Sequence, residues 1–255
     1  MILVIDVGNT NIVLGVFDGD ELVTNWRIGT DRRRTADDLG VLVKNLFYFR
    51  GLQIQDVDAL VMSSVVPPLT PAVSEMCRRY FGKDPLVVGP GVKTGMPNSG
   101  YENPREVGAD RIVNAISVAT RYGVPAVIID FGTATTFCAV SRSGEYLGGA
   151  IAPGIGVSTE ALFERAAKLP RIELAKPRQV IGKNTVASMQ AGIYYGFVGQ
   201  LDGIVQRIKA EIGDDAVVVA TGGYAELICS GTDCVDHIDP NITLWGLKII
   251  YERNS

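Results

Sequence analysis

The sequence predicts an α/β protein made of two similar lobes with a cleft between them, and three observations support this fold class. The chain has 255 residues, enough for one large domain or two modest ones. Residues 4–8 and 128–132 share one pattern, in which two apolar residues precede Asp, any residue and Gly. A hairpin follows each copy, so duplication of one supersecondary unit explains the two halves better than chance similarity does. We therefore expect an N-terminal lobe at 1–115 and a C-terminal lobe at 116–255.

The first half alternates strands with helices. Residues 2–7 form a β-branched run that is typical of a buried strand. The Asp-Gly-Asp run 18–20 marks the turn of a hairpin, and Thr35, followed three residues later by Asp38, is the expected N-cap of a helix. In chain order, the expected elements are strand 2–7, hairpin 11–28, helix 35–49, strand 57–67, helix 69–81, strand 85–89 and a loop rich in Gly, Pro and Asn at 89–104.

The second half repeats the strand-first order and is then mainly helical. Helices that follow a hairpin in each half are typical of a sheet covered by helices. In chain order, the expected elements are helix 109–122, strand and hairpin 125–151, a long helix 185–212, a strand with a glycine turn and a helix start at 216–227, and a closing helix 241–252.

Composition narrows the classes of function. The net charge of −4 argues against general binding to nucleic acid or to an anionic membrane surface, although a site can still attract an anionic substrate locally. Four scattered cysteines and one histidine argue against a disulfide framework or a Cys/His zinc site. The apolar N-terminus has no basic region, and no apolar run reaches the ~18 residues of a membrane span. We expect a soluble, cytoplasmic protein.

The stretch VIDVGNTN, residues 4–11, has the composition of a phosphate-binding turn. Gly8 lets the backbone approach an anion without a Cβ in the way, and successive N–H groups of a tight turn bind phosphate oxygens. The small polar residues 9–11 add donors, and Asp6 would hold Mg²⁺ through water. Residues 130–134 repeat this combination of an aspartate and a glycine turn. The alternative, that Asp-x-Gly merely ends a strand, fits one copy as well as the functional interpretation does but fits two copies less well.

Three other stretches also have ordinary structural interpretations. In VGADRIVNA, residues 107–115, Arg111 has the chemistry to bind a carboxylate and Asp110 to take a proton from a hydroxyl. The pattern alone favours the alternative, an acidic residue in a first helical turn beside a surface arginine. The GGY run 222–224 fits a nucleotide-binding turn and a plain strand-to-helix turn equally. The charged run 31–38 is typical of a solvated loop and helix cap.

Taken together, four motifs resemble those of the type III pantothenate kinases: DVGNTN at 6–11, GADR at 108–111, DFGTATT at 130–136 and TGGYA at 221–225. The resemblance runs along essentially the whole chain. It implies the duplicated ribonuclease-H-like fold of the acetate and sugar kinase/Hsp70/actin superfamily, in agreement with the internal repeat. It also implies ATP-dependent phosphorylation of pantothenate to 4′-phosphopantothenate, the first step of coenzyme A biosynthesis. The alternatives are another small-molecule kinase of the superfamily and a non-catalytic accessory factor in transcription.

The resemblance also assigns roles to residues. The implied ATP-binding residues are Asp6, Val7, Gly8, Asn9, Thr10, Asn11, Ile12, Val13 and Thr133. The implied pantothenate-binding residues are Tyr101, Gly108, Ala109, Asp110, Arg111 and Thr185, with Asp110 as the catalytic base. Asp130 matches the ligand of a monovalent cation, K⁺ or NH₄⁺, and Mg²⁺ accompanies ATP near Asp6. The family forms homodimers, and the long helix that begins at Thr185 is our candidate for part of that contact. The expected partners are ATP, pantothenate and a second copy of the chain, with no nucleic acid and no membrane.

Overall fold

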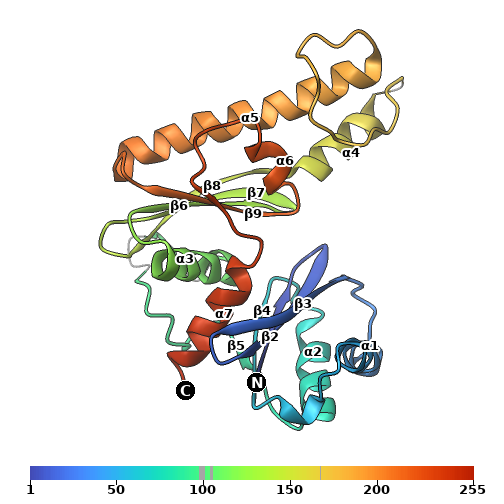
Figure 1. Ribbon diagram of the computed structural model, residues 1–255, viewed down its shortest axis with the longest axis vertical. Helices are drawn as coiled ribbons and strands as arrows, with labels where there is room; N and C mark the ends of the chain where they lie inside the picture. Colours follow the sequence, from blue (N-terminus) through green and yellow to red (C-terminus); the bar gives the residue numbers. More distant parts are fainter. Residues whose placement is uncertain (98–100, 104–105, 167) are drawn as a thin grey trace. The chain divides into compact units, whose positions relative to one another are not determined.

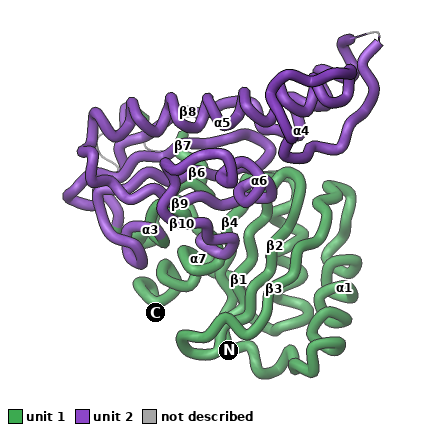
Figure 2. The backbone as a smooth tube through the Cα atoms, turned by 45° about the horizontal axis from the view of Figure 1, so that its top comes forward, with its two compact units in different colours: residues 1–95, 103–117, 243–255 green, residues 96–102, 118–242 purple. Residues whose placement is uncertain are grey.

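The chain divides into two compact units, each assembled from segments that are not contiguous in sequence (Figure 2). The computed structural model describes residues 1–97, 101–103, 106–166 and 168–255. Unit 1 comprises residues 1–95, 103–117 and 243–255, and unit 2 comprises residues 96–102 and 118–242. The expected division into lobes at 1–115 and 116–255 stays a prediction, and residues 243–255 of the C-terminal helix and tail are part of unit 1.

Unit 1 is built on a sheet that has five strands in the described residues. The strands are β1 (Ile2–Val7), β2 (Asn11–Asp18), β3 (Glu21–Gly29), β4 (Ala59–Ser64) and β5 (Leu86–Val87). They lie in the order β3-β2-β1-β4-β5. The first three pair antiparallel, whereas β4 runs parallel to β1 and β5 parallel to β4. The central strand β1 has neighbours on both edges, and the burial of the consecutive residues Leu3, Val4 and Ile5 shows that both of its faces are covered, which explains its apolar run.

Two helices pack against this sheet to form the core of unit 1. They are α1 (Ala36–Phe49) and α2 (Thr70–Met76), and α2 continues into the π-helical turn η2 (Cys77–Phe81). The 3₁₀ turn η1 (Ile54–Asp56) precedes β4. Apolar side chains at helical spacing, Leu39, Val43 and Phe47, join the buried cluster of the strands. The helices predicted over 35–49 and 69–81 are confirmed.

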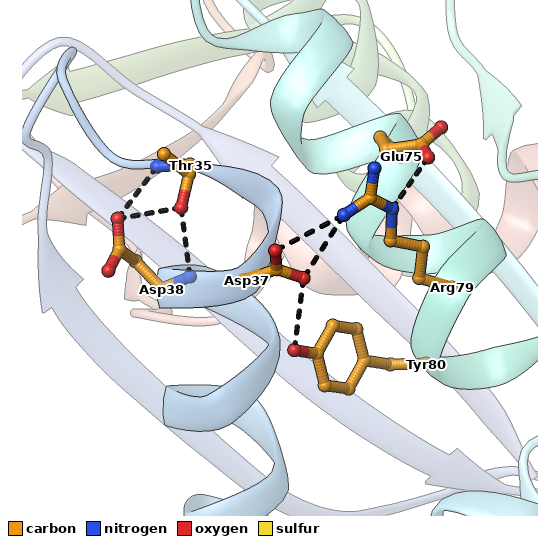
Figure 3. A network of polar contacts seen from close by, with 6 residues as sticks. All are labelled: Thr35, Asp37, Asp38, Glu75, Arg79 and Tyr80. Carbon is orange, nitrogen blue, oxygen red and sulfur yellow. Dashed lines mark hydrogen bonds and ion pairs between the residues drawn. The ribbon is translucent and has the colours of Figure 1, made fainter.

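The start of α1 is fixed by the polar contacts drawn in Figure 3. Thr35 and Asp38 form the predicted capping box, with the Thr35 backbone N–H donating to Asp38 Oδ2 at 2.9 Å and the Asp38 backbone N–H donating to Thr35 Oγ1 at 3.2 Å. Asp37 binds Arg79 Nη1 at 3.2 Å and accepts a hydrogen bond from the Tyr80 hydroxyl at 3.2 Å. The first turn of α1 is thereby tied to η2.

The C-terminal helix α7 (Ile242–Glu252) packs on β2 and on α3 (Ala109–Arg121). Trp245 lies edge-on to Phe17 of β2, with ring centroids 4.8 Å apart. Gly246 allows a close crossing, since a Cβ there would lie 2.1 Å from the carbonyl oxygen of Val113 in α3. These contacts explain why the end of the chain belongs to unit 1, which no local pattern in the sequence indicates.

Unit 2 is built on a second sheet, again with five strands as far as the chain is described. The strands are β6 (Ala126–Phe131), β7 (Ala134–Val140), β8 (Tyr146–Pro153), β9 (Val217–Gly222) and β10 (His237–Ile238). Their order is β10-β9-β6-β7-β8, with β6, β7 and β8 antiparallel and β9 parallel to both β6 and β10. If the strands of each unit are numbered in chain order and the second sheet is followed from β8 to β10, both sheets have the same order: third, second, first, fourth, fifth. The predicted duplication is confirmed.

Helices α4 (Ile155–Arg165), α5 (Thr185–Ile212) and α6 (Ala225–Cys229) complete unit 2. Helix α5 lies along the sheet (Figure 1), and its residues Tyr194, Leu201 and Val205 are buried in the core with strand residues of β6 and β9. Its bounds are those predicted for the long helix. None of the helices in the described part of the chain is long and apolar enough to cross a bilayer.

Candidate active site

In unit 1 the predicted phosphate-binding turn joins β1 to β2. The Gly8 N–H donates to the Asn11 carbonyl oxygen at 3.0 Å and closes the turn. A Cβ at Gly8 would lie 2.9 Å from that same oxygen, so the tight turn requires glycine. Asn9 and Thr10 are exposed at the tip. The neighbouring predicted ATP-binding residues Val7 and Ile12 have buried side chains, so only their backbone groups are available to a ligand.

Asp6 is half-buried at the end of β1 and has a partner in the parallel strand. The Ser63 hydroxyl donates to Asp6 Oδ1 at 2.7 Å, and Ser63 is fully buried. This bond fixes the orientation of the carboxylate at the carboxyl end of two parallel strands. Ser63 is not among the residues predicted from the sequence. The signal that was available is the Ser-Ser pair at the end of an otherwise apolar strand.

The chain immediately after β3 packs against the same turn. The Thr30 backbone N–H donates to the Thr10 carbonyl oxygen at 3.0 Å, and the Thr30 hydroxyl donates to the Gly8 carbonyl oxygen at 2.7 Å. Arg32 Nη2 donates to Asn9 Oδ1 at 3.2 Å. The charged run that the sequence analysis interpreted as a solvated loop therefore begins on the phosphate-binding turn.

Asp110 lies in the first turn of α3, also in unit 1, and is half-buried. Its Oδ1 accepts a hydrogen bond from the Arg111 backbone N–H at 2.8 Å, which folds the carboxylate back towards Gly108. A Cβ at Gly108 would lie 2.4 Å from that oxygen. Gly108 is thus needed for the observed position of the carboxylate, while Ala109 and Arg111 are half-buried beside it.

In unit 2 the equivalent turn joins β6 to β7. The Gly132 N–H donates to the Ala134 carbonyl oxygen at 3.1 Å, so this turn is one residue shorter than its counterpart in unit 1. Asp130, half-buried, pairs in register with Thr221 of the parallel strand β9. The register pair Asp6 and Ser63 is therefore repeated as an Asp and a hydroxyl residue in unit 2.

Two further glycine segments meet the turn of unit 2. A Cβ at Gly154, the N-cap of α4, would lie 2.2 Å from the Thr133 carbonyl oxygen. A Cβ at Gly222, where φ is +97°, would lie 2.6 Å from the Phe131 carbonyl oxygen. The start of α4 therefore packs on the predicted nucleotide-binding residue Thr133, and the end of β9 packs on Phe131, two residues earlier. Gly154 is not among the predicted site residues, although a proline-glycine pair at the end of a strand was an available signal.

The other two predicted substrate residues, Tyr101 and Thr185, also belong to unit 2. The Tyr101 ring packs against Gly148 of β8 and lies 6.1 Å from the Tyr146 ring, centroid to centroid. Thr185 is the exposed first residue of α5, directly after the N-cap Asn184. It lines a hollow of about 860 Å³ between the start of α5 and helix α4.

The donor atoms at the two aspartates suit hard cations. No group of three or more His, Cys, Asp or Glu side chains within the described residues is placed to hold a metal ion. Asp6 instead accepts a hydrogen bond from the Ser63 hydroxyl, and Asp130 pairs in register with Thr221, which also carries a hydroxyl. Oxygen donors fit Mg²⁺ and K⁺, and Mg²⁺ needs few protein carboxylates because it keeps waters and binds phosphates.

The folds of solved structures define the general class of this protein. The chain matches MreB 5 of Spiroplasma citri bound to AMPPNP with a TM-score of 0.55 and 10% identity, covering 99% of this chain and 96% of that one. It matches the ethanolamine utilization protein EutJ from Carboxydothermus hydrogenoformans with a TM-score of 0.57 and 15% identity, covering 97% and 89%. At these identities the likeness shows the fold alone, the two-lobed α/β fold of the acetate and sugar kinase/Hsp70/actin superfamily.

The family of the chain follows from its sequence. The profile of the type III pantothenate kinases matches residues 2–207. A relative from Moorella thermoacetica, named type III pantothenate kinase, is 59% identical over 255 residues and is covered over its full length. The chain therefore belongs to the type III pantothenate kinase family.

Proposed function

We propose that this chain transfers the γ-phosphoryl group of ATP to the primary hydroxyl of pantothenate, giving ADP and 4′-phosphopantothenate, the first step towards coenzyme A. One observation carries the proposal. The Asp-x-Gly turn occurs in both units at the same place in the sheet, with a hydroxyl residue of the parallel strand beside each Asp. Family membership then selects pantothenate as the acceptor.

The ATP-binding residues in this proposal come from both turns. In unit 1 the backbone N–H groups and small polar side chains of residues 8–11 bind phosphate oxygens. In unit 2 Thr133 contributes a hydroxyl from the shorter turn. Glycines at both turns leave the backbone uncovered, so an anion can approach it closely.

The two proposed cation sites lie at the carboxylates of Asp6 and Asp130. Asp6 would hold Mg²⁺, and Asp130 would hold the monovalent cation, K⁺ or NH₄⁺. When bound, these ions offset negative charge that spreads over the phosphate oxygens during phosphoryl transfer. The protein's own contribution is to hold each carboxylate still, as the bond from the buried Ser63 hydroxyl does for Asp6.

Asp110 is the base in this proposal. The pantothenate hydroxyl oxygen attacks the γ-phosphorus, the bond from that phosphorus to the β–γ bridging oxygen breaks, and the hydroxyl proton passes to the Asp110 carboxylate. General-base assistance contributes typically ~10²–10⁴-fold in enzymes. The Arg111 backbone N–H orients the carboxylate at 2.8 Å, and the Arg111 guanidinium, with Tyr101 and Thr185, is assigned to hold the rest of the substrate.

A homodimer completes the proposal. Large apolar side chains are exposed on β8, α4 and α5 of unit 2, and in this proposal the second chain of the dimer covers them. These side chains are Leu147, Ile151, Val157, Leu162, Val186 and Tyr195. Light scattering coupled to size exclusion tests the expected dimer, and a monomer at micromolar concentration would contradict it.

The test of the activity is ADP release by the purified chain with Mg²⁺, ATP and K⁺, with and without pantothenate. We expect pantothenate-dependent turnover that collapses in Asp110→Asn. Turnover that survives this substitution would keep the kinase but remove Asp110 from its role. A folded protein that shows no turnover with pantothenate would contradict the proposed function and favour another acceptor or a regulatory function.

A further inference from the structure

The segment that follows β3 is held on the phosphate-binding turn by backbone contacts. Thr30 contributes two hydrogen bonds, one to the Thr10 carbonyl oxygen and one to the Gly8 carbonyl oxygen, at 3.0 and 2.7 Å. Three residues beyond Arg32 the capping box of Thr35 begins α1 (Figure 3). The arginines at 32–34 are therefore carried on a short segment that is anchored at both ends.

The first two arginines of this segment have different partners. Arg33 forms an ion pair with Asp31, with its Nε 3.2 Å from Asp31 Oδ1 and its Nη2 3.2 Å from Asp31 Oδ2. These bonds hold the pKa of the Asp31 carboxyl below its usual value. Arg32 instead donates to the side chain of Asn9 at the tip of the turn. The nearest acidic side chain in sequence is thus engaged by Arg33, and the Arg32 guanidinium is directed to the turn.

Arg32 and Arg33 also differ in the surface that they line. Arg33 and Arg34 line a hollow of about 570 Å³ together with Asp31, Asp38 and Leu42. Arg32 does not line this hollow. Within the described residues, the hydrogen bond of the exposed Arg32 guanidinium goes to a neutral amide, which leaves its charge available for an anion. The planar guanidinium binds phosphate oxygens in pairs.

We propose that Arg32 binds the polyphosphate of the nucleotide on the Asp6–Asn11 turn. The proposal rests on the function proposed above, because it takes this turn as the phosphate site. Asn9 positions the guanidinium before the nucleotide arrives, and on binding Arg32 contacts phosphate oxygens beside the backbone N–H groups of the turn. Its charge also offsets the charge that spreads over the transferred phosphoryl group.

The test compares Arg32→Gln with Arg33→Gln, which removes the same charge from the adjacent residue. Hydrogen bonds to charged groups contribute about 1.5–3 kcal/mol, so we expect AMPPNP binding, measured by titration calorimetry, to weaken roughly 10- to 100-fold in Arg32→Gln. Adenosine binding should stay unchanged, and Arg33→Gln should bind both ligands like the wild type. Arg32→Lys, which keeps the charge, should recover part of the loss.

Several outcomes would overturn the proposal. AMPPNP affinity that is equal in the two glutamine variants would show that Arg32 makes no special contact. A loss that is equal for adenosine and AMPPNP, or a melting temperature that falls along with affinity, would show a structural role only. The binding assay needs no pantothenate. Its result on Arg32 therefore stands even where the wild type shows no pantothenate-dependent turnover, which would contradict only the proposed function.

Discussion

Gly108→Ala tests whether the position of the Asp110 carboxylate determines the rate. The added Cβ would lie 2.4 Å from Asp110 Oδ1. An ordinary contact between carbon and oxygen is about 3.3 Å or longer, so the carboxylate would have to move by about 1 Å. A misplacement of about 1 Å can cost on the order of 100-fold in rate, and we expect kcat to fall by about that factor.

The same substitution should leave the fold intact. The atom in the way is the end of a side chain, and the backbone of Gly108 is outside the left-handed region. Replacing Gly by Ala at such a position typically changes stability by only about 0.4–1 kcal/mol, or a few °C in melting temperature for a chain of this size. Gly89→Ala is the matched control, because nothing lies within 4 Å of its added Cβ, and it should keep wild-type rates.

The assay is ADP release at saturating ATP and pantothenate, with AMPPNP titration and thermal unfolding alongside. We expect nucleotide binding to stay within about threefold of wild type, since the phosphate-binding turn is built by other residues. A folded Gly108→Ala protein with wild-type kcat would refute the reasoning. Asp110→Asn then separates the causes, because full activity there too would mean that this carboxylate does not take the proton.

Two further predictions concern the two units separately. Gly154→Ala places a Cβ 2.2 Å from a backbone oxygen of the β6–β7 turn. Overpacking of this kind costs about 1–3 kcal/mol, so both the melting temperature and the affinity for AMPPNP should fall. A lower melting temperature with unchanged AMPPNP affinity would show that this turn does not contact the nucleotide. The hydrogen bonds from the backbone and side chain of Thr35 hold the pKa of Asp38 below its usual value. Its stabilising effect is therefore present above the unfolded pKa of about 3.9 and is lost as pH falls through the folded value. Asp38→Asn should unfold at a lower temperature than wild type at pH 7, and the difference should shrink below about pH 4; a constant difference would contradict the capping role.

The parts of the fold that the sequence predicts are those with strong local signals. The repeat was visible because Asp6 and Asp130 end apolar strands in the same pattern, and the two sheets share one strand order. Helix α5 was placed correctly because apolar residues at helical spacing run without interruption from its cap. The capping box of Thr35 and Asp38 was also predicted from the sequence, because its two partners are only three residues apart.

The parts that the sequence did not predict depend on contacts between distant residues. The packing of α7 in unit 1 rests on the closeness of Gly246 to Val113, and the support of Asp6 rests on Ser63 in another strand. Periodicity reports which face of an element is apolar, but it does not say which element will cover that face. For the same reason, a run of charges cannot show that Arg32 lies on the phosphate-binding turn.

The two copies of the turn are supported from the same topological position by different means. In unit 1 the residue after the third strand, Thr30, binds the turn, and Arg32 brings positive charge to it. In unit 2 the residue after the third strand, Gly154, packs on the turn, and it begins a helix whose N-terminus carries a partial positive charge. The structural repeat thus extends beyond the strands to the segment behind each turn. Both segments present positive potential to a turn that follows an aspartate, so we expect each to favour a polyanion. The guanidinium of Arg32 contributes a full charge, whereas α4 contributes only a dipole.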